Sequence, residues 1–198
     1  MTRPRTWASD ERFQQLLVDA RAGDEASFAE LWRMFNPVLV RFLSALAGTE
    51  DAAEVASAVW LEVVRSLDRF SGDEQGFRAW IFTIARHRLF DLRRAHRRRP
   101  PRSHDHDDSD RRRGPAPDPA SVVEAQWSTE QAVELIGRLP HDQAEVLMLR
   151  VIADLDVAIV AGMLGKQPGT VRVLAHRGLR RLAALLAEAD EAVTDVTR

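Results

Sequence analysis

Apolar residues recur at helical spacing through the first half of the chain. Phe13, Leu16, Leu17 and Ala20 stand at i, i+3, i+4 and i+7, which is one face of an α-helix. Three further stripes of this period follow, each after a short polar or glycine-bearing break: Phe28 to Leu46, Val55 to Leu67, and Phe77 to Leu92. Four helices with short connections predict a compact helical bundle over residues 10–98.

Local signals set the expected helix ends. Asp24 and Thr49 are capping residue types directly before the second and third stripes. The stripe runs through Pro37, so we expect a kink there and not a helix end. The polar stretch 69–76 is expected to be a loop. Trp32 and Trp60 lie on or beside the stripes, which favours packing in the core over stacking on bases.

Residues 99–125 have a different character. The stretch is rich in Pro, Arg and Asp and contains His104-Asp105-His106-Asp107. It has too few apolar residues to form a core and is expected to be a flexible linker. His and Asp are metal-ligating residue types, but a metal site needs a framework that fixes its ligands, so we expect no metal here.

Helical spacing resumes in a second domain, expected over residues 126–188. Ser128 begins a capping box and Asp142 is in position to cap the next helix. Between Leu155 and Leu182, a short helix, a turn at Gly165 and a long helix that starts at Pro168 predict a helix-turn-helix. The inner face of the long helix is expected to hold Val171, Leu174, Leu179, Leu182 and Leu186.

The outward face of this long helix has the residue types expected for binding DNA. A helix-turn-helix places its second helix in the major groove of DNA, where arginine binds guanine edges or phosphate. Between Lys166 and Arg181 there are five basic residues and no acid. The residues expected to face DNA, with the turn before them, are Lys166, Gln167, Thr170, Arg172, Val173, His176, Arg177 and Arg180.

Composition limits the possible fold class, the kinds of site and the location of the chain. The chain has 198 residues, 45% of them hydrophobic, and no Tyr. With few alternating β-branched runs, it favours an all-α fold: two small helical domains joined by a flexible linker. There is no Cys, which excludes disulfides and thiolate metal sites. No signal peptide or membrane span is recognisable, so a cytoplasmic location is expected.

Several blocks together resemble the extracytoplasmic-function sigma factors of the sigma-70 family. In the first half they are GDEASFAELW (23–32), DAAEV (51–55), WLEV (60–63), FSGD (70–73) and FRAWIFTIAR (77–86). In the second half they are LP (139–140), EVLMLR (145–150), LG (164–165), GTVR (169–172) and HR (176–177). The first set resembles region 2 of the family and the second set resembles region 4.

The resemblance implies a function without catalysis or cofactor. It implies that the chain binds core RNA polymerase and promoter DNA, and that an anti-sigma factor sequesters it. Region 2 would hold the polymerase clamp through Asp51, Glu54, Ser57 and Glu62. Region 4 would bind the −35 element. The residues implied for opening and reading the −10 element are Ser71, Gly72, Asp73, Glu74, Gln75, Gly76, Arg78, Trp80, Arg86 and His87.

Two other function classes compete with this interpretation. A helix-turn-helix regulator would bind duplex DNA without polymerase. An enzyme acting on nucleic acid would need a metal-binding carboxylate cluster, a phosphate-binding glycine loop or an activated nucleophile, and the sequence displays none of these patterns.

Overall fold

The computed structural model describes residues 7–98 and 129–196, and every regular element in these ranges is helical. The N-terminal bundle comprises α1 (Trp7–Arg21), α2 (Glu25–Ala47), α3 (Thr49–Ser66), the 3₁₀ turn η1 (Leu67–Arg69) and α4 (Glu74–Arg98). The C-terminal bundle comprises α5 (Thr129–Gly137), α6 (His141–Leu147), the π-helical turn η3 (Met148–Ile152), α7 (Val157–Leu164) and α8 (Pro168–Val196). The all-α fold expected from the sequence is confirmed.

The N-terminal bundle follows its apolar stripes. Phe13, Leu31, Phe42, Val59 and Phe77 are at most 1% exposed. Asp24 caps α2 as expected, because its carboxylate accepts the Ser27 backbone N–H at 2.7 Å. A hydrogen bond from the Ser27 side chain, followed by this one from its backbone, lowers the pKa of the Asp24 carboxyl. The helix α2 continues through Pro37.

Two expectations for this bundle are wrong. Thr49 is the first residue of α3 and does not cap it; Gly48 is the N-cap, with a φ of 93°. Trp32 is 42% exposed, so it is not a core residue, whereas Trp60 is buried. The Trp60 indole N–H also donates to Asn36 Oδ1 at 3.0 Å, which satisfies its polar end inside the bundle.

The C-terminal bundle contains the expected helix-turn-helix, with three differences in detail. The N-cap of α6 is Pro140, and Asp142 lies in the first turn. Helix α8 extends to Val196, beyond the expected end near Ala187. Leu179 is 50% exposed, and the neighbouring Gly178 takes its place on the inner face. The predicted cap at Ser128 lies outside the described residues.

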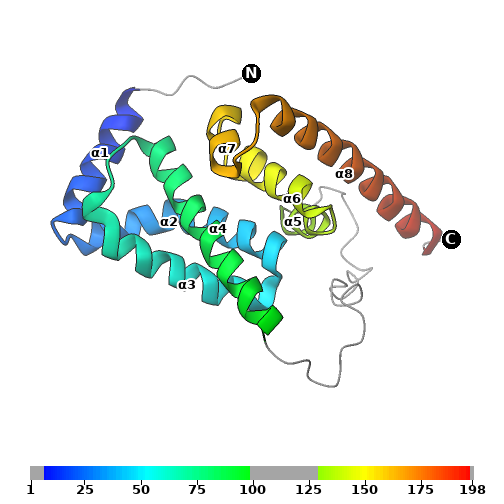
Figure 1. Ribbon diagram of the computed structural model, residues 1–198, viewed down its shortest axis with the longest axis horizontal. Coiled ribbons are helices and arrows are strands. Elements are labelled where there is room, and N and C mark those ends of the chain that lie inside the picture. The colour runs from blue at the N-terminus through cyan, green and yellow to red at the C-terminus, as the bar shows by residue number, and fades with distance from the viewer. Residues whose placement is uncertain (1–6, 99–128, 197–198) are drawn as a thin grey trace.

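The two bundles pack against each other (Figure 1). Helix α2 contacts α5, α6 and η3, and α4 contacts α7. Buried side chains of both bundles form one continuous apolar cluster. The approach is close at Gly137, where a Cβ atom would lie 2.9 Å from the backbone oxygen of Ala45. No helix in residues 7–98 or 129–196 is both long and apolar enough to cross a membrane.

Candidate nucleic-acid interface

The turn between α7 and α8 has the geometry that a helix-turn-helix requires. Gly165 adopts a left-handed conformation with a φ of 60°, and the Lys166 N–H donates to the Ala161 carbonyl at 2.9 Å. This arrangement satisfies orphan carbonyls at the end of α7. Val171 is fully buried, and Gly178 allows α8 to lie against Leu147. The turn and these contacts fix the orientation of α8.

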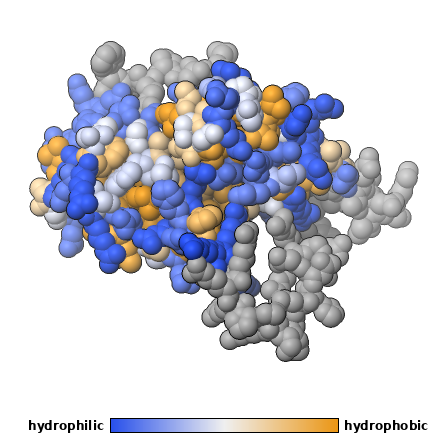
Figure 2. Space-filling model, viewed as in Figure 1, coloured by the Kyte–Doolittle hydropathy of each residue, from blue (hydrophilic) through white to orange (hydrophobic). Residues whose placement is uncertain are grey.

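The outer face of α8 is open to solvent. Figure 1 shows α8 on the outer side of the C-terminal bundle, and Figure 2 shows that most of the visible surface is hydrophilic. Lys166 is half-buried and forms an ion pair with Asp142 at 3.0 Å. The other residues predicted for this face are all exposed: Gln167, Thr170, Arg172, Val173, His176, Arg177 and Arg180.

The stretch expected to read the −10 element is only partly a loop. Ser71, Gly72 and Asp73 are exposed and precede α4, but Glu74, Gln75 and Gly76 form its first turn. The expectation of a loop through residue 76 is therefore wrong. Asp73 Oδ1 accepts the Gly76 N–H at 2.7 Å, which satisfies a free donor at the start of the helix.

Three of the residues predicted to bind DNA instead contact the C-terminal bundle. Gln75 Nε2 donates to the Asp154 carbonyl at 3.1 Å, and Arg78 Nη1 donates to the Ala153 carbonyl at 3.2 Å. Arg86 Nε donates to Glu145 Oε1 at 2.8 Å, and Arg86 Nη1 donates to the Met163 carbonyl. The Arg86 and Glu145 side chains are 23% and 12% exposed. This side of α4 is covered.

Another side of α4 is uncovered. His87 is exposed, and so are Phe90, at 65%, and Arg94. Trp80 is half-buried, and its ring stacks on Phe70 at 5.0 Å between centroids. The residues predicted to read the −10 element are thus divided between a covered side and an open side of one helix.

Comparison with known proteins identifies the family. Residues 31–99 match the family model for Sigma-70 region 2, and residues 129–182 match that for Sigma-70 region 4. The chain is 31% identical over 177 residues to the ECF RNA polymerase sigma factor SigD of Mycobacterium tuberculosis H37Rv, an alignment covering 87% of this chain and 82% of SigD. The chain belongs to the ECF family of RNA polymerase sigma factors. The resemblance expected from the sequence is confirmed.

A second relative supports the family assignment, and two solved structures share the fold. The chain is 33% identical over 181 residues to ECF sigma factor ShbA of Streptomyces griseus, covering 86% of this chain and 93% of ShbA. Its fold is similar to that of CnrH in complex with the cytosolic domain of CnrY, with a TM-score of 0.58, 22% identity, and coverage of 89% of this chain and 98% of CnrH. The fold is also similar to that of sigma factor RpoE in complex with the anti-sigma factor NepR from Bartonella quintana, with a TM-score of 0.62 and 22% identity. This match covers 81% of this chain and 96% of RpoE.

The predicted polymerase-binding residues of this sigma factor lie on α3. Glu54 and Ser57 are exposed, and Asp51 is half-buried. Glu62 points towards α4, where its carboxylate accepts a hydrogen bond from Arg88 at 3.1 Å. Helix α3 packs mainly on α2 and α4, and in Figure 1 it lies at the edge of the molecule opposite α8.

Sequence reasoning missed one titratable residue of the sigma factor, His141. It begins α6, and Arg93 of α4 lies 2.8 Å from its Nε2 atom. A guanidinium group can only donate, so this ring nitrogen must be unprotonated in the contact. Burial, followed by the charge of Arg93, lowers the pKa of His141, with Arg86 adding to the effect and Glu145 and Asp142 opposing it. Neutral His141 thus belongs to the contact between the bundles.

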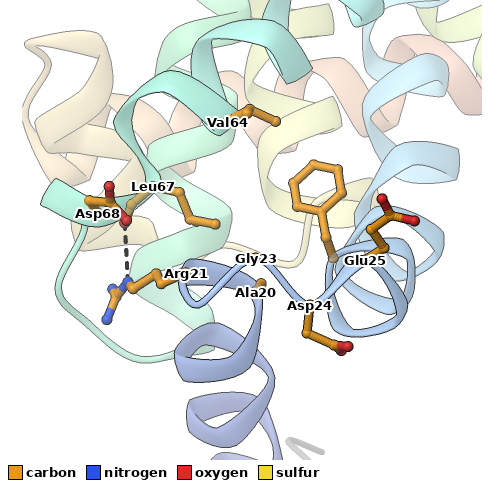
Figure 3. A pocket seen from close by; sticks show the side chains of 9 residues that line it. Ala20, Arg21, Gly23, Asp24, Glu25, Val64, Leu67 and Asp68 are labelled. Atoms are coloured by element: carbon orange, nitrogen blue, oxygen red, sulfur yellow. Dashed lines mark hydrogen bonds between the residues drawn. The ribbon is translucent and has the colours of Figure 1, made fainter.

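A shallow pocket of about 370 Å³ lies where the α1–α2 connection meets the end of α3 (Figure 3). Arg21 crosses it and donates from Nε to the Leu67 carbonyl at 3.2 Å, and also to the Phe70 carbonyl. Arg21 therefore ties α1 to the turn before Ser71.

Among residues 7–98 and 129–196, no group of three or more His, Cys, Asp or Glu could hold a metal ion. The His104–Asp107 stretch lies outside this part of the chain.

Proposed function

We propose that this sigma factor directs core RNA polymerase to promoters with a division of roles between its bundles. The N-terminal bundle (residues 10–98) binds the polymerase clamp and opens the −10 element, and the C-terminal bundle (residues 126–188) binds the −35 element. The protein supplies no catalysis and needs no cofactor; it acts by binding. Family membership supports the class of function, and the exposed basic face of α8 carries the assignment of roles.

Charge and exposure support the −35 role. Arg172, Arg177 and Arg180 are exposed on one helix, and no acid lies between residues 166 and 187. Buried Val171 and the turn at Gly165 hold that helix outward, as binding in a major groove requires. A bidentate arginine–guanine contact contributes about 1–3 kcal/mol of discrimination between bases.

The test replaces these arginines one at a time by Ala, with Arg33→Ala as the matched control because Arg33 is exposed on the distant helix α2. Transcription with core polymerase on genomic fragments first supplies a responsive promoter. Loss of a base contact should weaken promoter binding by about 1–3 kcal/mol, whereas loss of a phosphate contact should make the salt dependence shallower. Unchanged transcription in all three variants would contradict the −35 assignment.

The −10 role is proposed for the exposed loop Ser71–Asp73 and the start of α4. Gly72 has a φ of 155°, and a Cβ atom added there would lie 3.1 Å from the Phe70 ring, so this position favours glycine. A base removed from the stack costs a few kcal/mol and needs a binding surface that compensates. Phe70 and Trp80 border the loop with aromatic surface suited to stacking.

The polymerase role is proposed for the exposed side of α3, at Asp51, Glu54 and Ser57, with Glu62 beside it. A regulator that binds duplex DNA alone is the competing function. Binding of this chain to core polymerase, measured by co-purification, separates the two. A sigma factor should shift promoter DNA poorly until polymerase is added, and a regulator should shift it unaided.

We also propose that an anti-sigma factor binds this protein. The fold is shared with a sigma factor solved together with the anti-sigma factor NepR. Co-expression of this chain with candidate proteins from its own genome tests the proposal. A true anti-sigma factor should block transcription at equimolar ratio, and excess core polymerase should relieve the block.

A further inference from the structure

Two side chains of α1 hold the backbone on either side of Ser71. Gln14 Nε2 donates to the Gly72 carbonyl at 2.9 Å, and Arg21 Nη2 donates to the Phe70 carbonyl. Seven residues separate Gln14 from Arg21, which is close to two helical turns, so both side chains lie on one side of α1. One helix therefore fixes the peptide groups that precede and follow Ser71.

Arg21 joins two backbone groups at once. Its Nε atom donates to the Leu67 carbonyl at 3.2 Å, in addition to the bond to Phe70. Figure 3 shows the Arg21 side chain extending from the end of α1 towards Leu67. The Leu67 carbonyl also accepts the Phe70 N–H at 3.2 Å, so Arg21 fixes the turn from which the chain continues to Ser71.

The other contacts of this loop leave its apex open. The Phe70 ring lies beside Gly72, since a Cβ atom added at Gly72 would lie 3.1 Å from it. Asp73 Oδ1 accepts the Gly76 N–H at 2.7 Å, which fixes the start of α4. Ser71 is exposed between these fixed points. The loop is thus held at both ends and presents Ser71 to solvent.

We propose that Gln14 and Arg21 are positioning residues for the −10 loop (Ser71–Asp73): they hold its backbone in the conformation that receives the unstacked base, and so set affinity and base preference without contacting DNA. The inference rests on the proposed function, since that function assigns this loop to the −10 element. Both residues precede the segment 31–99 that matches the region 2 model, so the match itself gives them no role.

Preorganisation is the physical basis of this role. Ordering a flexible backbone at the moment of binding costs conformational entropy, and a loop already held in its binding conformation avoids that cost. If only the held conformation binds the base, the apparent dissociation constant rises as the held fraction falls. A neutral hydrogen bond changes such an equilibrium by about two- to tenfold, and a bond from a charged donor by about tenfold or more.

Two variants remove these hydrogen bonds and keep the size or the charge of the side chain. Gln14→Met removes the donor amide and keeps a long side chain that favours helix. Arg21→Lys keeps the positive charge, but an ammonium group on a flexible stem does not reproduce the planar fork that joins two carbonyls. A role for Arg21 in attracting DNA phosphate would survive this change, whereas a positioning role would not.

Neighbouring residues of α1 supply matched controls. Gln15→Met removes a hydrogen bond of the same kind that stays within α1, from Gln15 Nε2 to Asp19 Oδ1 at 2.9 Å. Arg12→Lys alters an arginine of α1 that pairs with Glu30 of α2. Neither contact involves the −10 loop, so both controls should behave as the parent chain.

The measurement uses the holoenzyme that this chain forms with core polymerase. The probes are the single-stranded −10 segment of a promoter that this holoenzyme transcribes, and the same strand with one base of that segment exchanged. Gln14→Met should weaken binding of the first strand by about two- to tenfold, and Arg21→Lys by about tenfold or more. In both variants the ratio of the two affinities should fall towards one. A merely structural defect would lower the active fraction and leave that ratio unchanged.

Three further measurements test how the effect arises. The salt dependence of strand binding should stay unchanged, because no phosphate contact is lost. The affinity for core polymerase should also stay unchanged. Backbone NMR order parameters of Ser71 and Gly72 in the free chain should fall from the rigid range, about 0.85, towards the flexible range below about 0.6. Circular dichroism checks that each variant is folded, and Gln14 is exposed, so its replacement leaves the core intact.

The outcomes separate this inference from the proposed function. Parent affinity and parent ratio in both variants would overturn the positioning role. Parent binding in Arg21→Lys, with weaker binding and a shallower salt dependence in Arg21→Ala, would also overturn it, because that pattern belongs to a phosphate contact. A parent holoenzyme that binds both strands equally would instead contradict the −10 role of the loop, and the order parameters would still decide whether α1 holds it.

Discussion

Replacing Gly165 by Ala tests the turn that orients the recognition helix. Gly165 has a φ of 60°, and a Cβ atom built there meets nothing within 4 Å. The cost is therefore one of backbone conformation alone, about 1–2 kcal/mol for an L-residue in the left-handed region. Alanine also lowers the entropy of the unfolded chain, which returns part of that cost. We expect a net loss of about 1 kcal/mol in the free energy of unfolding.

Gly162 supplies the matched control three residues earlier. Its Cβ position is equally empty, but its φ is not positive, so Gly162→Ala should stabilise the helix by up to about 1 kcal/mol. Gly165→Asn should fall between the two, because Asn tolerates the left-handed region better than Ala. Urea denaturation followed by circular dichroism gives the midpoints. Equal midpoints for Gly165→Ala and Gly162→Ala would refute the reasoning.

Two further predictions concern α4 and the loop before it. Exchanging residues 71–76 for the corresponding segment of a relative should change the preferred −10 sequence in transcription assays and leave polymerase affinity unchanged; an unaltered preference in a folded chimera would count against the −10 assignment. The pKa of His141 is lowered where the bundles pack, so the packed arrangement binds fewer protons than separated bundles and is favoured above the usual histidine pKa. As pH falls below about 6.5, protonation of His141 should weaken the contact and move the bundles apart. Scattering between pH 8 and 5 should show this expansion, and His141→Gln should reduce it.

The sequence predicted the helices well because each buries one apolar face. The errors are small and have physical causes. The apolar side chain of Leu179 predicts a place on the inner face of α8, but Gly178 occupies that face. Glycine has no side chain, so the sequence pattern does not indicate that it is buried. Thr49 and Asp142 are good capping residue types, yet the chain turns one or two residues earlier, at Gly48 and Pro140.

The packing of the bundles could not be predicted from the pattern. Gln75, Arg78 and Arg86 end largely on backbone carbonyls, and every residue has a carbonyl, so no residue type marks the partner. Gly137 allows α5 to approach the Ala45 backbone, but a single glycine at a helix end is equally typical of an ordinary helix stop. Family resemblance supplied roles for α4 without indicating that one side of it is covered.

The open face of α8 gives the molecule a further property. Its arginines are exposed, and positive charge of this kind attracts any DNA through release of counterions, without regard to sequence. We therefore expect the chain to associate weakly with duplex DNA of any sequence and to move along it. Search along DNA would then need only this charge, whereas the choice of one site would need contacts to particular bases.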